Sequence, residues 1–170
     1  MPEGCEKMSK QGDAAYAWFL KGYNCSQSVV AAFAPQLGLT EEMALRLSAG
    51  FGAGIGRMRE VCGAFCGMVT VLSLVYADPA DPKDKSRMYA LVQQAAEQYR
   101  TRNGGGSIIC RELLARAGAV PTEGTAAEER TADYYKKRPC PELCRLCADL
   151  CAEFIAAHPE GRHGLYKEDA

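Results

Sequence analysis

The sequence predicts an all-α protein, a single-domain bundle of about six helices. Apolar residues recur at steps of three and four along almost the whole chain, and no segment alternates in the way that a half-buried strand does. Residues typical of caps and turns divide this pattern into segments of helical length. With 170 residues the chain can bury a core without cross-links. We expect one domain over 1–170, with a core from about 10 to 157 and a polar tail at 158–170.

Four helical segments are expected in the first half of the chain, at about 14–20, 25–33, 41–51 and 61–76. Asn24 and Thr40 are suitable N-cap residues for the second and third segments. Gly50, Gly52, Gly54 and Gly56 then break the pattern, as does the stretch 35–38. The fourth segment lies in the longest uncharged run, 61–77, which is short for a membrane span and contains two glycines. A buried central helix is therefore expected.

In the second half, start and stop signals divide the chain into four further segments. Ser107 is a candidate cap, Thr125 with Glu128 forms a candidate capping box, and Pro141 suits a first helical turn. The expected segments are Lys83–Arg102, which is amphipathic, Ile108–Ala117, a short helix from Thr125 reaching Lys137, and a last helix to about Ala157.

Charge and composition exclude several classes of function. The formal net charge is −1 and the pI about 6.1, which provides no positive field for a nucleic acid. The first residues lack the basic start and apolar stretch of a secretory signal, so we expect a cytoplasmic protein without a membrane span. The two histidines, His158 and His163, lie in the tail and are expected to be solvated, which disfavours histidine-based catalysis.

Cysteine content is the outstanding feature of the composition. In a reducing cytoplasm such thiols stay free, bind metal or react catalytically. The nine cysteines are Cys5, Cys25, Cys62, Cys66, Cys110, Cys140, Cys144, Cys147 and Cys151.

Four of these cysteines fall close to predicted helix starts: Cys25, Cys62, Cys110 and Cys140. Unpaired N–H groups and the positive end of the helix dipole favour thiolate there, and thiolate is the form that attacks disulfides and binds metals. The alternative is that each cysteine is only a small buried hydrophobic residue. The alternating glycines from Gly50 to Gly56 lack the residues of a phosphate-binding loop, so we expect them to bring backbone N–H groups to a sulfur or a cluster.

Two further cysteine patterns lie on single helices. Cys62 and Cys66 are four residues apart and are candidate catalytic residues, although a direct bond between them would be strained. Cys140, Cys144, Cys147 and Cys151 share one stripe, but the outer two are roughly 16 Å apart along the helix axis, so one metal ion cannot hold all four. The favoured interpretation of the last three is a core-facing stripe beside Leu143 and Leu150.

The segments Gly22-Tyr23-Asn24-Cys25 and Cys62-Gly63-Ala64-Phe65-Cys66-Gly67 carry a known pattern. The chain resembles the C-GCAxxG-C-C family of redox-active proteins, with Cys110 and Cys140 as the later matching cysteines. The resemblance implies a redox role and an association with a transporter system. A similar domain occurs in split-Soret cytochromes, which implies an iron–sulfur cluster here, although the chain has no CxxCH for a covalent haem. The additional Cys66, Cys144, Cys147 and Cys151 leave open how many sulfurs form the site.

Three functional hypotheses follow. The first is that Cys25, Cys62, Cys110 and Cys140 bind an iron–sulfur cluster, or another metal, for electron transfer or sensing. The second is an oxidoreductase-like thiol–disulfide exchanger that uses Cys62 with Cys66, Cys110 or Cys140 as the resolving cysteine. The third is a structural zinc domain or a transporter-associated binding domain. An unidentified redox partner is expected in the first two, and a homodimer is left open.

Overall fold

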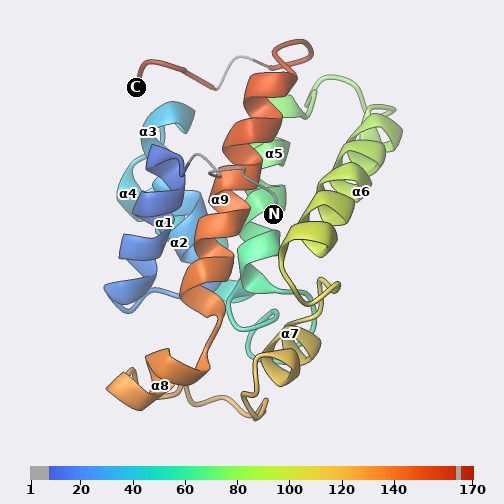
Figure 1. The fold of residues 1–170 in the computed structure, drawn as a ribbon. Coiled ribbons are helices and arrows are strands. Elements are labelled where there is room, and N and C mark those ends of the chain that lie inside the picture. Colours follow the sequence, from blue (N-terminus) through green and yellow to red (C-terminus); the bar gives the residue numbers. More distant parts are fainter. Residues whose placement is uncertain (1–7, 164–165) are drawn as a thin grey trace.

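The computed structural model describes residues 8–163 and 166–170, and these parts contain helices and no strand (Figure 1). The all-α prediction is confirmed. Among the described α-helices, six have eight residues or more, which agrees with the predicted number. The elements are α1 Lys10–Leu20, α2 Cys25–Ala32, α3 Ala34–Leu37, α4 Glu41–Ser48, the 3₁₀ turn η1 Ala49–Phe51, α5 Gly63–Tyr76, α6 Lys85–Arg102, α7 Cys110–Arg116, α8 Ala132–Lys137 and α9 Cys140–Ala157.

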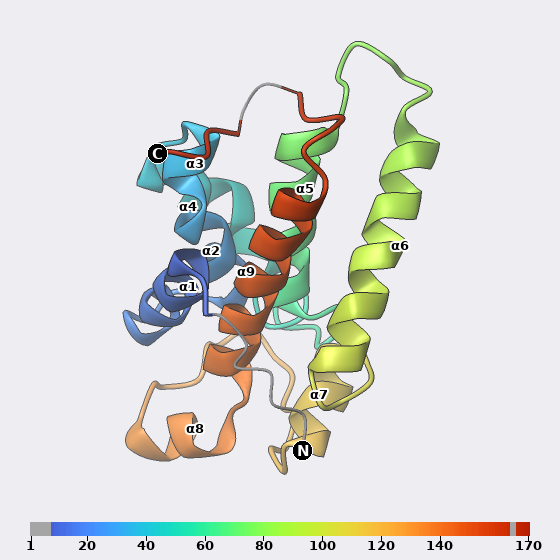
Figure 2. The same ribbon diagram turned by 45° about the horizontal axis from the view of Figure 1, so that its top comes forward.

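Helices α5 and α9 lie side by side at the centre of the bundle, with α1 and α2 on one side and α6 on the other (Figures 1 and 2). Helix α9 contacts α1, α2, α5 and α6. Helices α5 and α9 both begin at the lower end in Figure 1, where α7 and α8 also lie. We call this lower part of the bundle the site end, because the cysteines discussed below meet there.

Side-chain caps explain several helix starts. The Asn24 side chain accepts from the Gln27 N–H, and the Gln27 side chain accepts from the Asn24 N–H, so a full capping box begins α2. The Thr40 hydroxyl accepts from the Met43 N–H at the start of α4. Both caps were predicted. Ser9 caps α1, which therefore begins at Lys10, four residues earlier than expected.

Three expectations for local structure were wrong. Thr125 and Glu128 form no capping box, because the Glu128 carboxylate binds arginine side chains instead and α8 begins only at Ala132. Ser107 does not cap α7; its hydroxyl accepts from the Ile109 N–H and donates to Glu112. The stretch 35–38 is not a simple break, since Ala34–Leu37 forms the short helix α3 with Pro35 in its first turn.

The core lies between α2, α5, α9 and the inner face of α1. Helix α5 carries no charged residue and is buried on most of its circumference, as expected for a central helix. The predicted cysteine stripe on α9 is confirmed as core-facing, because Cys144, Cys147 and Cys151 are fully buried near Leu143 and Leu150. No described helix is long and apolar enough to cross a membrane.

The C-terminal tail returns to the bundle. The Lys167 N–H donates to the Gln36 carbonyl, and the Gln36 amide donates to the Ala170 carbonyl, which attaches the tail to α3. His163 is exposed as expected. His158 is not simply solvated, because it is half-buried and its ring stacks on Phe154 with 4.2 Å between the centroids.

Candidate functional site

The four cysteines at helix starts line one enclosed cavity at the site end. Cys25, Cys110 and Cys140 are the first residues of α2, α7 and α9, and Cys62 is the N-cap of α5. The cavity measures about 10 Å³, and its other lining residues are Gly63, Leu113, Leu114 and Leu143. This is about the space of a single water molecule at most. The structure thus brings together four sulfurs from distant parts of the sequence.

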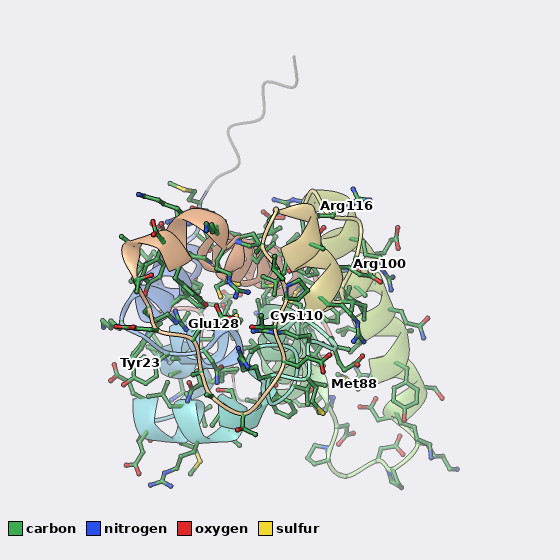
Figure 3. All side chains as sticks on the ribbon, turned by 90° about the horizontal axis from the view of Figure 1, so that it is seen from below. Tyr23, Met88, Arg100, Cys110, Arg116 and Glu128 are labelled. Atoms are coloured by element: carbon green, nitrogen blue, oxygen red, sulfur yellow. The ribbon has the colours of Figure 1, made fainter. Side chains whose placement is uncertain are left out.

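Four helix N-termini therefore meet around one small space. The first N–H groups of each helix have no partner within the helix, and the dipole makes this end positive. Figure 3 looks onto the site end and shows Cys110 near the middle of the view, with Glu128 beside it. The combined field favours negative charge on the sulfurs at the cavity.

Cys25 is the cysteine whose thiolate form is favoured. Thiol groups of Cys140 and Cys144 form hydrogen bonds with its sulfur, and these lower the pKa of Cys25 well below the usual range of a thiol. Burial opposes the shift, whereas the positive charge of Arg130 and the backbone N–H of Ala53 add to it. The predicted contact between the glycine loop and a sulfur is thus present at Ala53.

The neighbouring thiols are shifted in the opposite direction. Burial, with the charge on Cys25 as the second cause, raises the pKa of Cys62 to about 12. The hydrogen bond with Cys25, followed by burial, raises the pKa of Cys140, and burial is the main cause for Cys144. The site therefore favours a thiolate at Cys25 and protonated thiols at Cys62, Cys140 and Cys144.

Arg130 is a residue that the sequence pattern did not reveal. Its guanidinium donates to the carbonyls of Phe19 and Tyr23, and it lies over the Phe19 ring at 4.1 Å. These contacts fix a positive charge between the end of α1 and the start of α2, near Cys25. Only the packing of segment 121–131 against α1 places it there, and no local motif reports such a contact.

A cluster of arginines adjoins Cys110. Arg57, Arg59 and Arg138 all bind the Glu128 carboxylate, so one negative charge faces three positive charges. Arg59 is almost fully buried, and its Nη1 group lies 4.0 Å from the Cys110 sulfur, to which it donates. Burial raises the pKa of Cys110, and the charge on Cys25 adds to this, whereas the Arg59 guanidinium lowers it. The arginine cluster thus extends the positive electrostatic field from Cys25 to Cys110.

We expect Arg59→Gln to slow alkylation of Cys110 several-fold at a fixed pH near 9, because the thiol loses the donor that lowers its pKa. Peptide mass spectrometry after timed treatment with iodoacetamide measures this rate. Arg57→Gln is the matched control, since Arg57 binds the same carboxylate but has no contact with Cys110 among the described hydrogen bonds. Equal Cys110 rates in the two variants would contradict the assigned role.

The remaining cysteines lie around this centre. Cys66 does not line the cavity; its thiol donates to the Val61 carbonyl, and burial raises its pKa to about 11. The Cys62 sulfur lies 3.4 Å from the Tyr99 hydroxyl, and Tyr99 also contacts the thiol of Cys147. Cys5 lies outside the described residues. Of the predicted catalytic pair, the structure brings Cys62 to the cavity and leaves Cys66 away from it.

Residues 23–154 match the family described as "Putative redox-active protein (C_GCAxxG_C_C)". The chain belongs to this family. No curated protein and no solved structure matches it. In this C_GCAxxG_C_C member the motif glycines serve the packing of the site, because added Cβ atoms would lie 2.9 Å from the Phe51 carbonyl at Gly63 and 2.9 Å from the Ser26 carbonyl at Gly67. Helix α5 can therefore approach α2 closely.

The site has suitable donor atoms for a metal or cluster, but not the arrangement or the space. Four thiolate ligands are the right donors for an iron–sulfur cluster or zinc. Among the described residues, however, no group of three or more Cys, His, Asp or Glu side chains is arranged to hold an ion. A cluster also exceeds a cavity of about 10 Å³. The side chains as they stand do not fit the group, so we derive no step through a metal.

The loop that supplies the Ala53 N–H has a rare conformation. Residues 53–57 all have positive φ, and the four positive-φ residues other than glycine in the described chain are Ala53, Ile55, Arg57 and Arg59. The left-handed conformation costs roughly 1–2 kcal/mol for each such residue. Strain of this kind persists where the surroundings fix it, and it clusters at functional sites. Here it places Ala53 against Cys25 and Arg59 against Cys110.

We expect Gly54→Ala to destabilise this C_GCAxxG_C_C member more than Gly56→Ala does. Both glycines have positive φ, so each substitution costs about 1–2 kcal/mol of unfolding free energy. An added Cβ at Gly54 would also lie 2.7 Å from the Cys110 Cβ and from backbone atoms of Arg59 and Glu60, which adds about 1–3 kcal/mol. At Gly56 the nearest atom is 3.9 Å away. Urea denaturation of both variants compares the two costs, and equal midpoints would refute the close packing.

Proposed function

We propose that this chain is a thiol-based redox protein that exchanges disulfides through Cys25, with Cys140 as the resolving cysteine. The observation that carries the proposal is that Cys25 and Cys140, the first residues of α2 and α9, line the same cavity of about 10 Å³. Hydrogen bonding from Cys140 also lowers the pKa of Cys25. A thiolate in contact with a second thiol is the arrangement required for a reversible dithiol–disulfide pair. Membership of a family described as redox-active supports it.

The exchange has two steps. The Cys25 thiolate attacks one sulfur of a disulfide substrate, which forms a mixed disulfide and releases the other half as a thiolate. Cys140, losing its proton to that leaving group or to solvent, then attacks the Cys25 sulfur. The bond between Cys25 and the substrate breaks, a Cys25–Cys140 disulfide forms, and the second half of the substrate leaves. The substrate gains two electrons, and a dithiol reductant restores the two cysteines.

Cys25 is given the attacking role in place of Cys62. The sequence predicted Cys62 as the reactive cysteine, with Cys66, Cys110 or Cys140 as the resolving cysteine, and that role stays a prediction. Burial raises the pKa values of both thiols, to about 12 for Cys62 and about 11 for Cys66, so little thiolate forms at either near neutral pH. Cys25 combines a lowered pKa with a half-buried position at a capped helix start.

Mapping of disulfides after mild oxidation tests the proposal. The reduced full-length protein is treated with glutathione disulfide, quenched in acid, alkylated and digested, and cross-linked peptides are identified by mass spectrometry. We expect a Cys25–Cys140 bond in the wild type and, in Cys140→Ser, glutathione on Cys25 as the first product. Cys66→Ser is the control and should behave as the wild type. A wild-type protein whose Cys25 stays reduced under these conditions would refute the proposal.

An iron–sulfur centre held by Cys25, Cys62, Cys110 and Cys140 is the second candidate function. The convergence of these four sulfurs on one cavity supports it, although the cavity must widen to admit a cluster. Anaerobic purification with iron and sulfide analysis, followed by reconstitution, tests it. A protein that stays colourless and free of iron after reconstitution would exclude it. The zinc, transporter, homodimer and cytoplasmic expectations stay predictions.

A further inference from the structure

Two thiols of α9, Cys140 and Cys144, are neighbours of Cys25 on α2, and the proposed exchange involves only Cys140. Cys140 and Cys144 lie one turn apart on α9; Cys140 lines the cavity together with Cys25, and both thiols lower the pKa of Cys25. The Cys144 sulfur also lies 3.7 Å from the Cys25 carbonyl oxygen, so its thiol faces both the backbone and the side chain of Cys25. The first turn of α2 is therefore in contact with two successive turns of α9.

The two neighbours differ in their distance from solvent. Cys140 is half-buried and packs with Cys110, Leu114 and Ala119. Ala119 in turn lines a surface pocket of about 520 Å³, so Cys140 lies close to the surface. Cys144 has no exposed area and belongs to the main core. A disulfide from Cys25 to Cys140 would lie near the pocket, whereas one to Cys144 would lie inside the bundle.

We infer that Cys144 is a second resolving cysteine, and that the oxidised site exchanges between a Cys25–Cys140 and a Cys25–Cys144 disulfide. The inference rests on the proposed function. In this step the Cys144 sulfur attacks the Cys25 sulfur, the Cys25–Cys144 bond forms, and the Cys25–Cys140 bond breaks. The proton lost by Cys144 is taken up by the released Cys140 sulfur. No electron enters or leaves, so the step needs no further oxidant or reductant.

This exchange gives the oxidised site two states, which differ in how easily a reductant reaches the disulfide. A bulky reductant, such as a partner protein carrying two thiols, reaches a disulfide near the surface pocket but not one within the core. The Cys25–Cys144 state thus protects the oxidised form from reduction by macromolecules. Exchange back to Cys140 makes the disulfide accessible again, which makes the position of the bond a control on the release of oxidising equivalents.

Oxidation of single and double variants tests the inference. Reduced full-length Cys140→Ser is treated with glutathione disulfide, and its cross-linked peptides are mapped over time. We expect the early Cys25–glutathione disulfide to be replaced by a Cys25–Cys144 bond. Cys140→Ser with Cys147→Ser is the matched control, because Cys147 lies one turn further along α9 and contacts Tyr99. It should still form the Cys25–Cys144 bond, whereas Cys140→Ser with Cys144→Ala should retain glutathione on Cys25.

A time course on the wild-type protein makes the test independent of any variant that fails to fold. We expect the Cys25–Cys140 peptide to appear first and the Cys25–Cys144 peptide to grow at its expense after glutathione disulfide is removed. A wild-type protein that forms only Cys25–Cys140, together with a Cys140→Ser variant that keeps glutathione on Cys25, would overturn the inference and leave the proposed function standing. A wild-type Cys25 that forms no disulfide would instead overturn the proposed function.

Discussion

We expect Cys25→Ser to remove the fastest-reacting thiol among the eight described cysteines. An ordinary thiol with a pKa of about 8.5 is only a few per cent thiolate at pH 7, so a lowered pKa increases its alkylation rate by roughly tenfold. The pKa of Cys25 is lowered by the Cys140 and Cys144 thiols, and those of its neighbours are raised. Timed iodoacetamide labelling at pH 7, read by peptide mass spectrometry, measures the rate at each cysteine.

Cys66→Ser is the matched control for this experiment. Cys66 is also half-buried, but its pKa is raised to about 11, so the fast phase should persist in that variant. A fast phase that survives in Cys25→Ser, or one that disappears in Cys66→Ser, would contradict the assignment of the thiolate. The pH profile gives a second criterion, because the Cys25 rate should level off at a lower pH than the rates of the other cysteines.

The second large effect is a loss of stability at alkaline pH. Burial raises the pKa values of Cys62, Cys144, Cys147 and Cys151 in the folded protein. In the folded protein each of these thiols keeps its proton, whereas in the unfolded chain it is deprotonated above a pH of about 8.5. Its stabilising contribution is complete below that pH and is lost as the pH rises toward the folded value, about 12 for Cys62. Well above pH 8.5 the unfolding free energy should fall by about 1.4 kcal/mol per pH unit for each such thiol.

Cys25 acts in the opposite sense, because its folded pKa is lowered. Its contribution is complete above the pKa of the unfolded thiol and is lost as the pH falls through the folded value, so Cys25 does not change the slope well above pH of about 8.5. Denaturation in a non-thiol reductant at pH 7.5, 9.5 and 10.5 measures the net slope. Cys151→Ala is the control, since burial is the cause of the Cys151 shift. Its slope should be shallower by up to about 1.4 kcal/mol per pH unit, and parallel curves would refute the account.

Local rules sufficed for part of the site. The four cysteines of the cavity were predicted from helix-start signals within a few residues of each, and these signals held even though Ser107 does not cap α7. The contact of Cys144 with Cys25 was not predicted, because it spans 119 positions and depends on how α2 crosses α9. The left-handed turn was missed for another reason. Alternating glycines signalled a break, but Ala53, Ile55, Arg57 and Arg59 are not residues that ordinarily adopt positive φ.

The Thr125–Glu128 error shows how tertiary contacts override a local motif. A glutamate three residues after a threonine favours a capping box only if its carboxylate has no better partner. Here the Glu128 carboxylate meets Arg57, Arg59 and Arg138, and charge-assisted bonds of this kind are about twice as strong as neutral ones. The segment therefore forms no helix before Ala132, and Glu128 instead binds Arg59, which donates to the Cys110 sulfur.

Helices α5 and α9 run in the same direction, so their dipoles add along the bundle. The opposite end of the bundle holds their last carbonyl groups, and guanidinium groups lie there: Arg87 donates to the Tyr76 carbonyl and Arg162 to the Ile155 carbonyl. Arginine side chains thus compensate the negative C-terminal ends of α5 and α9, and their charge is permanent. The positive N-terminal ends face cysteine sulfurs, whose charge can change. In the proposed Cys25 disulfide only the sulfur end would lose its negative charge, so the electrostatic potential at the site end would differ between oxidised and reduced protein without any movement of the backbone.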